Sequence, residues 1–346
     1  MQDSLIRVGV IGAGANTRLH HIPKLQAQDG VEIVGVCNRS RASSERVARE
    51  FGIPRVYEHW EQVIDDPAIH AIVIGTWPYM HAPITLAALE AGKHVMTEAR
   101  MACNAAEAHR MLAASLAHPD LVTQIVPAPF SLRVDRTVQR LLREGFLGDL
   151  LVVEHVGTGG WLDREAPMHW RQNRAYSGLN IMMLGIVYEM LMRWVGEAVE
   201  VTANGCVFVR KRKGEDGLLH EVHVPDHLDV LATLACGALC HIQQSAVTAL
   251  RSGVGTWLHG SEGMLHFYNG ILSGARKGDD RMVSIEIPEE EQGGWRVEEE
   301  FVWAIRGQEK ISHTTFEDGV KYMEFTEAVS RSMAEKCAVG LPLAWV

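Results

Sequence analysis

The sequence predicts an α/β protein with two domains. Residues 1–126 are expected to form a doubly wound parallel sheet, because short apolar runs of strand length alternate there with helical patterns. Residues 127–346 are expected to form an α+β domain with a large, mainly antiparallel open sheet, because long alternating runs follow one another across glycine turns. A chain of 346 residues is long enough for both domains.

The opening stretch predicts a nucleotide-binding turn. Ile6–Ile11 is a β-branched run that ends at Gly12 and Gly14, where the missing Cβ atoms let the backbone turn sharply and approach a ligand. A helix that begins just after this turn would offer unpaired N–H groups to a pyrophosphate. The pattern reads G-x-G-x-x-T, with Thr17 where a third glycine or alanine is usual. A second strand, Val31–Cys37, follows at βαβ spacing, so dinucleotide binding is favoured over a bare structural turn.

The rest of the first domain repeats this alternation. Its further strands are expected at residues 55–57, 71–75, 94–97 and 121–126. Its further helices are expected at residues 41–51, 58–64, 84–91 and 105–117. One more helix, at residues 133–144, is expected before a hinge at residues 145–148. The pair His20-His21 is expected on the first helix, near the ligand and exposed to solvent.

The second domain is expected to be mostly strands. They are placed at residues 150–156, 199–210, 227–236, 238–247, 263–268, 282–287 and 297–305. Two helices are placed at residues 179–194 and 316–337. The basic run at residues 210–213 is expected to be a solvated hairpin tip.

Composition excludes several classes of function. The formal charge of −10 argues against a general nucleic-acid surface, and no apolar run is long enough to predict a membrane span. The first residues lack the basic and then apolar layout of a signal peptide, and the six cysteines are scattered without paired spacing, so a cytoplasmic protein with reduced thiols is expected. His220 and His223 would face opposite sides of a strand, so no metal site is expected.

Five segments together carry a family resemblance. They are VGVIGAG at residues 8–14, IGTWPYMHAPITLAALEAGKHVMTEA at 74–99, GFLGDLLVVEH at 145–155, MLMRWVG at 190–196 and TTFEDGVKYMEFTEAV at 314–329. With them the chain resembles the glucose-fructose oxidoreductase, inositol dehydrogenase and MocA (Gfo/Idh/MocA) family along nearly its whole length. The resemblance implies a Rossmann domain, NAD(P)-dependent hydride transfer at a secondary hydroxyl of a sugar, polyol or related ring, and a homodimer or homotetramer that uses the open sheet.

The resemblance also implies a cofactor site. Its glycine turn corresponds to Gly12 and Gly14, and the turn is followed by Asn16 and Thr17. The implied nicotinamide-ribose side and its surroundings correspond to Thr76, Trp77, Pro78, His81, Glu98, Trp170 and Arg171.

The residues after the second strand bear on the choice of nucleotide. Asn38, Arg39 and Ser40 stand where an acidic residue would accept hydrogen bonds from the ribose of NAD. Asn38 carries no charge to repel a 2′-phosphate, while Arg39 and Ser40 are able to hold one. NADP is therefore expected, with NAD as the second choice. The alternative is that Arg39 stacks on the adenine or points to water.

The positions that carry the family's chemistry depart from its pattern. The lysine of the Glu-Lys-Pro signature is replaced by Ala99. Alignment on Gly185 and Arg193-Trp194 puts three apolar residues, Met183, Val187 and Met190, in place of an aspartate, a histidine and a second aspartate. Since oxidation of an alcohol also requires loss of the hydroxyl proton, other residues must take over proton transfer.

Three residues of this chain are predicted to take over the roles of the missing family residues. His169 is the preferred proton-transfer residue and Tyr188 the second, with a core aromatic as the alternative for Tyr188. Asn180 is predicted to hold a substrate hydroxyl or carbonyl. The polar loop at residues 161–176 suggests a pocket for a polar substrate, carboxylated or sugar-like, or else a surface loop with ion pairs.

The function expected from this sequence is therefore that of an NAD(P)-dependent oxidoreductase that acts on a sugar-like, polyol or cyclic hydroxy compound with non-standard acid and base residues. Two alternatives stay open. One is an enzyme that retains its nucleotide and catalyses elimination, hydrolysis or epimerisation without net redox change. The other is a non-catalytic, cofactor-binding sensor.

Overall fold

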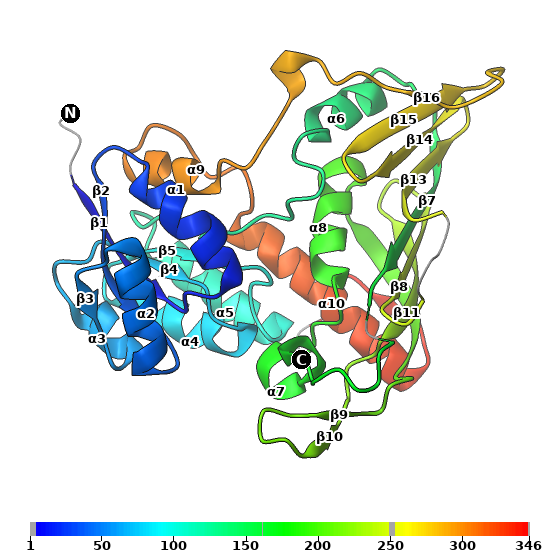
Figure 1. Cartoon of the computed structure of the whole chain (residues 1–346). Helices are drawn as coiled ribbons and strands as arrows, with labels where there is room; N and C mark the ends of the chain where they lie inside the picture. The colour runs from blue at the N-terminus through cyan, green and yellow to red at the C-terminus, as the bar shows by residue number, and fades with distance from the viewer. Residues whose placement is uncertain (1–4, 161, 249–252, 345–346) are drawn as a thin grey trace. The chain divides into compact units, whose positions relative to one another are not determined.

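The computed structural model describes residues 5–160, 162–248 and 253–344 (Figure 1). The chain divides into two compact units. The first unit consists of Met1–Pro127 together with Arg296–Met323, and the second consists of Ala128–Trp295 together with Glu324–Val346. The expected division at residue 126 did not anticipate that residues 296–323 return to the first unit.

The first unit is built on a six-stranded sheet in the order β3-β2-β1-β4-β5-β6, and all of its strand pairs are parallel. The strands are β1 (Ile6–Ile11), β2 (Val31–Cys37), β3 (Arg55–Val56), β4 (Ala71–Ile74), β5 (His94–Thr97) and β6 (Thr123–Ile125). The order reverses beside β1, which pairs with β2 on one side and β4 on the other. In such sheets a ligand binds beyond the carboxyl ends of the strands at this switch point.

The helices of the first unit follow the expected alternation. They are α1 (Ile22–Gln26), α2 (Arg41–Phe51), α3 (Trp60–Asp65), α4 (His81–Glu90), α5 (Ala105–Ala117) and α9 (Val297–Ile305). A π-helical turn, Thr17–His21, precedes α1. All four residues of β4 are buried, which fits the middle of a parallel sheet with helices on both faces.

Helix α9 corrects a prediction, because residues 297–305 were expected to be a strand. The buried residues Val297, Phe301 and Val302 are spaced at i, i+4 and i+5, which suits one face of a helix and not the alternation of a strand. This helix packs on α1, and Thr314 pairs with Ile125 through the backbone. These contacts explain why the segment belongs to the first unit.

The second unit is built on a nine-stranded sheet in the order β16-β15-β14-β13-β7-β12-β11-β8-β17. The long strands are β7 (Leu150–Thr158), β8 (Ala198–Cys206), β11 (His227–Leu234), β12 (Leu239–Ser245), β13 (Gly255–Gly260), β14 (Gly263–Tyr268) and β15 (Ile271–Arg276). The edge strands are β16 (Val283–Ser284) and β17 (Val339–Gly340). Every pair is antiparallel except β7 with β12, which confirms the mainly antiparallel sheet. Strands β13 and β15 were not predicted.

Helices cover one face of this sheet. They are α6 (Asp135–Arg143), the short α7 (Arg174–Ser177), α8 (Leu184–Val195) and the later part of α10 (Phe316–Glu335). Helix α8 packs on the sheet through an edge-to-face contact of Trp194 with Phe267, and on α10 through Tyr188 stacked on Phe325. Helix α8 begins five residues later than expected, so residues 179–183 precede it.

A small hairpin of β9 (Lys211–Lys213) and β10 (Leu219–Glu221) carries the basic run. The expectation of a fully solvated tip was wrong for Arg212, whose side chain is 1% exposed. Its guanidinium donates to the carbonyl oxygens of Asp163 at 2.6 Å and Ala166 at 3.1 Å. These hydrogen bonds compensate for burying the charge and tie the polar loop to the hairpin.

Candidate nucleotide site and substrate cavity

The glycine turn after β1 leaves room for a ligand. Gly12 has a φ of +86°, and a Cβ there would lie 2.6 Å from the backbone nitrogen of Thr76, so no other residue fits without strain. A Cβ on Gly14 would meet only the carbonyl oxygen of Gly75, at 3.6 Å. Gly12 is therefore required by the fold itself, while Gly14 leaves open the space that a phosphate would need.

Thr17 completes this turn in place of the usual third glycine. Its hydroxyl is buried and donates to the carbonyl oxygen of Gly12 at 3.3 Å. The same side chain occupies the space that a side chain on Gly75 would need. The threonine is thus accommodated because position 75 has no side chain.

Asn38 holds the turn to the end of β2. Its Oδ1 accepts a 2.6 Å hydrogen bond from the backbone nitrogen of Ala13, and its Nδ2 donates to the hydroxyl of Ser43 at 3.0 Å. Ser40 is the N-cap of α2. The guanidinium carbon of Arg39 lies 5.3 Å from the centre of the Trp77 ring, which is a cation–π contact. A positive side chain and a helix N-terminus therefore lie at the carboxyl end of β2.

The loop after β4 contains one polar atom that a ligand would satisfy. The hydroxyl of Thr76 is buried and has no hydrogen-bond partner among the described residues. Pro78 is buried at the start of the following turn. His81 is enclosed rather than open to a ligand, because its Nε2 lies 3.0 Å from the carbonyl oxygen of Thr76 and its Nδ1 lies 2.9 Å from that of Arg100. Burial lowers the pKa of His81, and as a neutral imidazole with one N–H it donates to only one of these two carbonyl oxygens.

A buried charged cluster follows β5. Nε2 of His21 lies 2.9 Å from Oε1 of Glu98, and its Nδ1 lies 2.6 Å from Oε1 of Glu298. Burial opposes the charge, but the hydrogen bonds to Glu298 and then Glu98 raise the pKa of His21 to about 9. Asn16 also donates to Glu98, at 2.5 Å. His21 was expected to be solvated, but it is buried as an imidazolium between two carboxylates, and 15% of the Glu98 side chain remains exposed.

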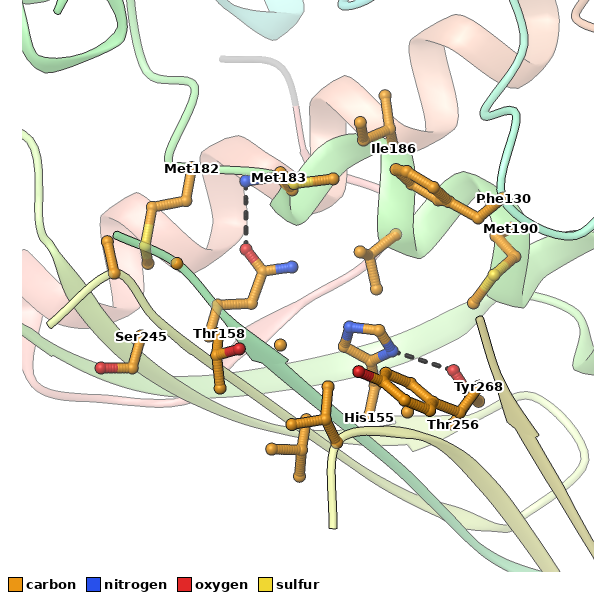
Figure 2. Close-up of a pocket in the computed structure, with 18 of the residues that line it drawn as sticks. Phe130, His155, Thr158, Met182, Met183, Ile186, Met190, Ser245, Thr256 and Tyr268 are labelled. Carbon is orange, nitrogen blue, oxygen red and sulfur yellow. Dashed lines mark hydrogen bonds between the residues drawn. The ribbon is translucent and has the colours of Figure 1, made fainter. Parts of the chain in front are cut away.

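The second unit contains an open cavity of about 790 Å³ between α8 and the sheet (Figure 2). One wall comes from α8 and the residue before it, Met183, with Ile186, Val187 and Met190. These positions are spaced at i, i+3, i+4 and i+7, so they share one helix face. Three of them, Met183, Val187 and Met190, are the positions that the resemblance aligns with titratable residues, and their side chains carry no group that titrates.

The opposite wall comes from the sheet and presents polar side chains among apolar ones. In Figure 2 His155 and Thr256 lie opposite the side chains of the α8 wall. Nδ1 of His155 lies 2.9 Å from the hydroxyl of Thr256, which leaves Nε2 to meet a ligand. Burial lowers the pKa of His155 to about 4, so the imidazole is neutral near pH 7. Oε1 of Gln244 accepts from the backbone nitrogen of Met183 at 3.1 Å, which leaves the amide nitrogen of Gln244 to donate.

Sequence reasoning did not single out His155 as a candidate functional residue. It lies in the segment GFLGDLLVVEH that carries the resemblance, but no role was assigned to it. The sequence pattern that could have indicated His155 is its position two residues after Val153, which is buried, so both side chains lie on the inward face of β7. A histidine at a position that alternation assigns to the core is a candidate for a cavity.

Of the three predicted catalytic residues, only His169 lies at the cavity. Its ring Nδ1 accepts from the backbone nitrogen of Arg171 at 3.2 Å, and partial burial and the Arg171 charge lower its pKa. Arg171 also lines the cavity, and its guanidinium carbon lies 4.2 Å from the centre of the Trp170 ring. In the polar loop at residues 161–176, these two are the described residues that reach the cavity.

Tyr188 and Asn180 are placed elsewhere, which corrects both predictions. The Tyr188 hydroxyl accepts from the backbone nitrogen of Ala198 at 2.7 Å, its ring is buried against Phe325, and burial raises its pKa well above the ordinary value. Asn180 is buried before α8, and its Nδ2 donates to the carbonyl oxygen of Ser177 at 2.7 Å. Neither side chain lines the cavity. Tyr188 lies on the face of α8 that packs against Phe325, and Asn180 precedes the helix.

Comparison with known proteins agrees with the resemblance. Residues 6–124 match the oxidoreductase family with an NAD-binding Rossmann fold, and residues 136–266 match the GFO/IDH/MocA C-terminal domain. The chain is 26% identical over 294 residues to levoglucosan dehydrogenase of Pseudarthrobacter phenanthrenivorans, covering 76% of this chain and 73% of that protein. It is 24% identical over 340 residues to scyllo-inositol 2-dehydrogenase (NADP(+)) IolW of Bacillus subtilis, covering 96% and 88%.

A solved structure is also similar. A levoglucosan dehydrogenase in complex with NADH and L-sorbose aligns with a TM-score of 0.84 at 23% identity, over 97% of this chain and 99% of that one.

None of the helices in the described parts of the chain combines the length and apolar character needed to cross a membrane. The two family matches, one in each unit, together span more than half of the chain, which therefore belongs to the Gfo/Idh/MocA family of NAD-binding oxidoreductases.

Proposed function

We propose that this oxidoreductase transfers hydride to or from a secondary alcohol or ketone of a sugar-like, polyol or cyclic hydroxy substrate, and that His155 handles the proton. The first unit would bind the nucleotide and the cavity of the second would bind the substrate. The single observation that carries the proposal is a neutral, ligand-facing imidazole in a cavity whose α8 wall has lost every titratable residue of the family pattern.

The residues at the switch point fit a nicotinamide dinucleotide. Gly14 leaves space for the pyrophosphate, and the unpaired hydroxyl of Thr76 offers a hydrogen bond at the next strand end. The exposed edge of Glu98 is an acceptor for ribose hydroxyls, and Asn16 lies beside it. The nucleotide, when bound, supplies the hydride acceptor or donor.

NADP is the proposed nucleotide, with NAD as the second choice. Arg39 and the N-terminus of α2 at Ser40 supply positive charge at the end of β2, and Asn38 there carries no negative charge. Among the relatives, the scyllo-inositol dehydrogenase is named for NADP(+), whereas the levoglucosan dehydrogenase structure contains NADH. The local charge in this chain is the argument that favours NADP.

His155 is the proposed proton carrier, and its lowered pKa favours return of the proton over its removal. As a neutral base, its Nε2 would accept the proton of a substrate hydroxyl while hydride leaves the carbon, and Thr256 would hold the ring through Nδ1. Because its pKa is about 4, the imidazolium formed is a strong enough acid to return the proton to a developing alkoxide. His169, at the cavity rim, is the second proposed proton carrier.

Two further features bear on partners. Arg171 would hold the acid group of a carboxylated substrate at the cavity rim. Leu231 and Leu239 are 59% and 60% exposed on the face of the sheet that points away from the cavity, which supports a homodimer or homotetramer through that face. A cytoplasmic location remains part of the proposal.

The test uses the purified full chain with NADP or NAD and a panel of sugars, polyols and cyclic alcohols, monitored at the absorbance of the reduced nicotinamide. We expect His155→Ala to lower kcat by about 10²- to 10⁴-fold, which is the usual contribution of a positioned acid or base. His118→Ala is the matched control, because His118 lines neither the glycine turn nor the cavity.

Two results would favour the alternatives. Nucleotide-dependent consumption of substrate without net reduction would support an enzyme that retains its cofactor. Tight nucleotide binding without turnover of any substrate in the panel would support a sensor.

A further inference from the structure

We propose that the cavity selects cyclic alcohols with hydroxyls on one edge and hydrocarbon on the other, in preference to fully hydroxylated polyols. The inference rests on the proposed role of this cavity as the substrate site and narrows the substrate class. It comes from the unequal chemistry of the two walls, which Figure 2 shows on opposite sides of the cavity.

The apolar wall is continuous. Met183, Ile186, Val187 and Met190 form one face of α8, and Phe130 joins them in Figure 2. None of these side chains can donate a hydrogen bond, and only the methionine sulfurs can accept one, weakly. Methionine side chains adapt to irregular apolar shapes, so this wall suits the hydrocarbon part of a ring.

Two of the polar groups that line the cavity come from neighbouring strands of the sheet. His155 on β7 and Gln244 on β12 are near neighbours on the same face of the sheet, because His155 pairs with Ile242 and Gln244 pairs with Gly157. Nδ1 of His155 is held by Thr256 and Oε1 of Gln244 by the backbone of Met183. The nitrogens that remain, Nε2 of His155 and Nε2 of Gln244, would meet two neighbouring hydroxyls of one ring.

Selectivity follows from the cost of desolvation. A polyol ring carries hydroxyls on every edge, so those that lie against α8 lose water and gain no partner from that wall. One buried polar group without a partner typically weakens binding by about tenfold or more. A cyclic diol avoids this loss because its second edge is hydrocarbon.

The binding experiment uses the full chain saturated with NADPH and two probes, trans-cyclohexane-1,2-diol and myo-inositol, in titration calorimetry. We expect the diol to bind at least about tenfold more tightly than the inositol. Equal or tighter binding of the inositol would overturn the inference, and so would failure of both probes to bind.

A variant pair tests the wall itself. Met183 is 41% exposed, so Met183→Gln is expected to fold normally, which a thermal melt would check. Met183→Gln should shift the ratio of affinities toward the inositol by about fivefold or more, because it gives the wall a hydrogen-bonding group. Met183→Leu should preserve the preference for the diol, because the wall stays apolar. An unchanged ratio in Met183→Gln would overturn the inference.

Turnover separates this inference from the proposed function. If the diol binds preferentially but no alcohol reduces NADP, the proposed selectivity of the cavity is supported and the proposed reaction is contradicted. If the inositol binds more tightly than the diol and is oxidised faster, the proposed reaction is supported and the proposed selectivity is contradicted.

Discussion

Nδ1 of His21 lies 2.6 Å from Oε1 of Glu298, although 277 residues separate the two in the chain. The same ring reaches Glu98 through Nε2, so one imidazole joins the turn after β1, the end of β5 and the returning helix α9. Because both carboxylates favour its charged form, the ring is an imidazolium in the folded protein near neutral pH. This buried cluster connects the stability of the first unit to the proposed nucleotide site.

The cluster predicts that stability falls at alkaline pH. The pKa of His21 is raised from 6.5 to about 9 on folding, so its contribution is complete below pH 6.5 and is lost as the pH rises through 9. We expect the Tm of the nucleotide-free protein to fall by several degrees over that range, as measured by calorimetry. His21→Gln should have a lower Tm at pH 6.5 and a flatter profile, whereas a profile as steep as that of the wild type would contradict the assignment.

Substitutions of the two glycines of the turn are predicted to have different effects, one on stability and the other on nucleotide binding. Gly12→Ala forces a Cβ to within 2.6 Å of the Thr76 nitrogen at a φ of +86°, and we expect it to lower stability by about 1–3 kcal/mol. Gly14→Ala meets only one atom, at 3.6 Å, so its melting curve should match that of the wild type while nucleotide affinity drops by about tenfold or more. Thermal melts and fluorescence titration distinguish the two, and tight nucleotide binding by Gly14→Ala would argue against the proposed pyrophosphate position.

The choice between nucleotides is predicted to depend on Arg39. Arg39→Glu should weaken NADP binding by about tenfold to 100-fold, the usual effect of losing a charged hydrogen bond to phosphate, and should leave NAD binding largely unchanged. Arg41→Ala is the matched control, because Arg41 already pairs with Glu45 and Glu58 on the surface. Equal losses for both nucleotides, or no loss, would show that Arg39 does not contact the 2′-phosphate.

Tyr188 is predicted to matter for stability and not for proton transfer. Tyr188→Phe leaves the buried backbone nitrogen of Ala198 without its partner, so we expect a loss of about 1–3 kcal/mol in urea unfolding. The kcat of the oxidoreductase reaction should stay within about twofold of the wild type, because Tyr188 does not line the cavity. A tenfold fall in kcat with normal stability would instead indicate that Tyr188 takes part in catalysis.

Local patterns in the sequence were sufficient to predict most of the helices and strands. β4 could be predicted because its four apolar residues suit a strand covered on both faces, and α2 because Ser40 begins it and Gly52 ends it. The glycine turn was recognisable for the same kind of reason, since Gly12 needs a backbone conformation that glycine adopts readily. Helix α9 was misread as a strand because its run of nine residues is short and rich in β-branched and aromatic types.

The candidate site was less accessible to sequence reasoning. Tyr188 and Asn180 have the chemistry of catalytic residues, but burial gives both of them structural partners. His155 stands in a strand like many surface histidines, and only the packing of α8 against the sheet encloses it in a cavity. The pKa of such a group depends on neighbours that are distant in the chain, so alternation and spacing alone do not reveal it.

By itself the sequence determined most of the strands and helices and the glycine turn, because these depend on residues close together in the chain. Only the tertiary structure decided that His21 is charged, that His155 is neutral and that Glu298 belongs to the first unit. Burial and pairing across long separations set the free energy of each charge, and those neighbours exist only once the chain has folded.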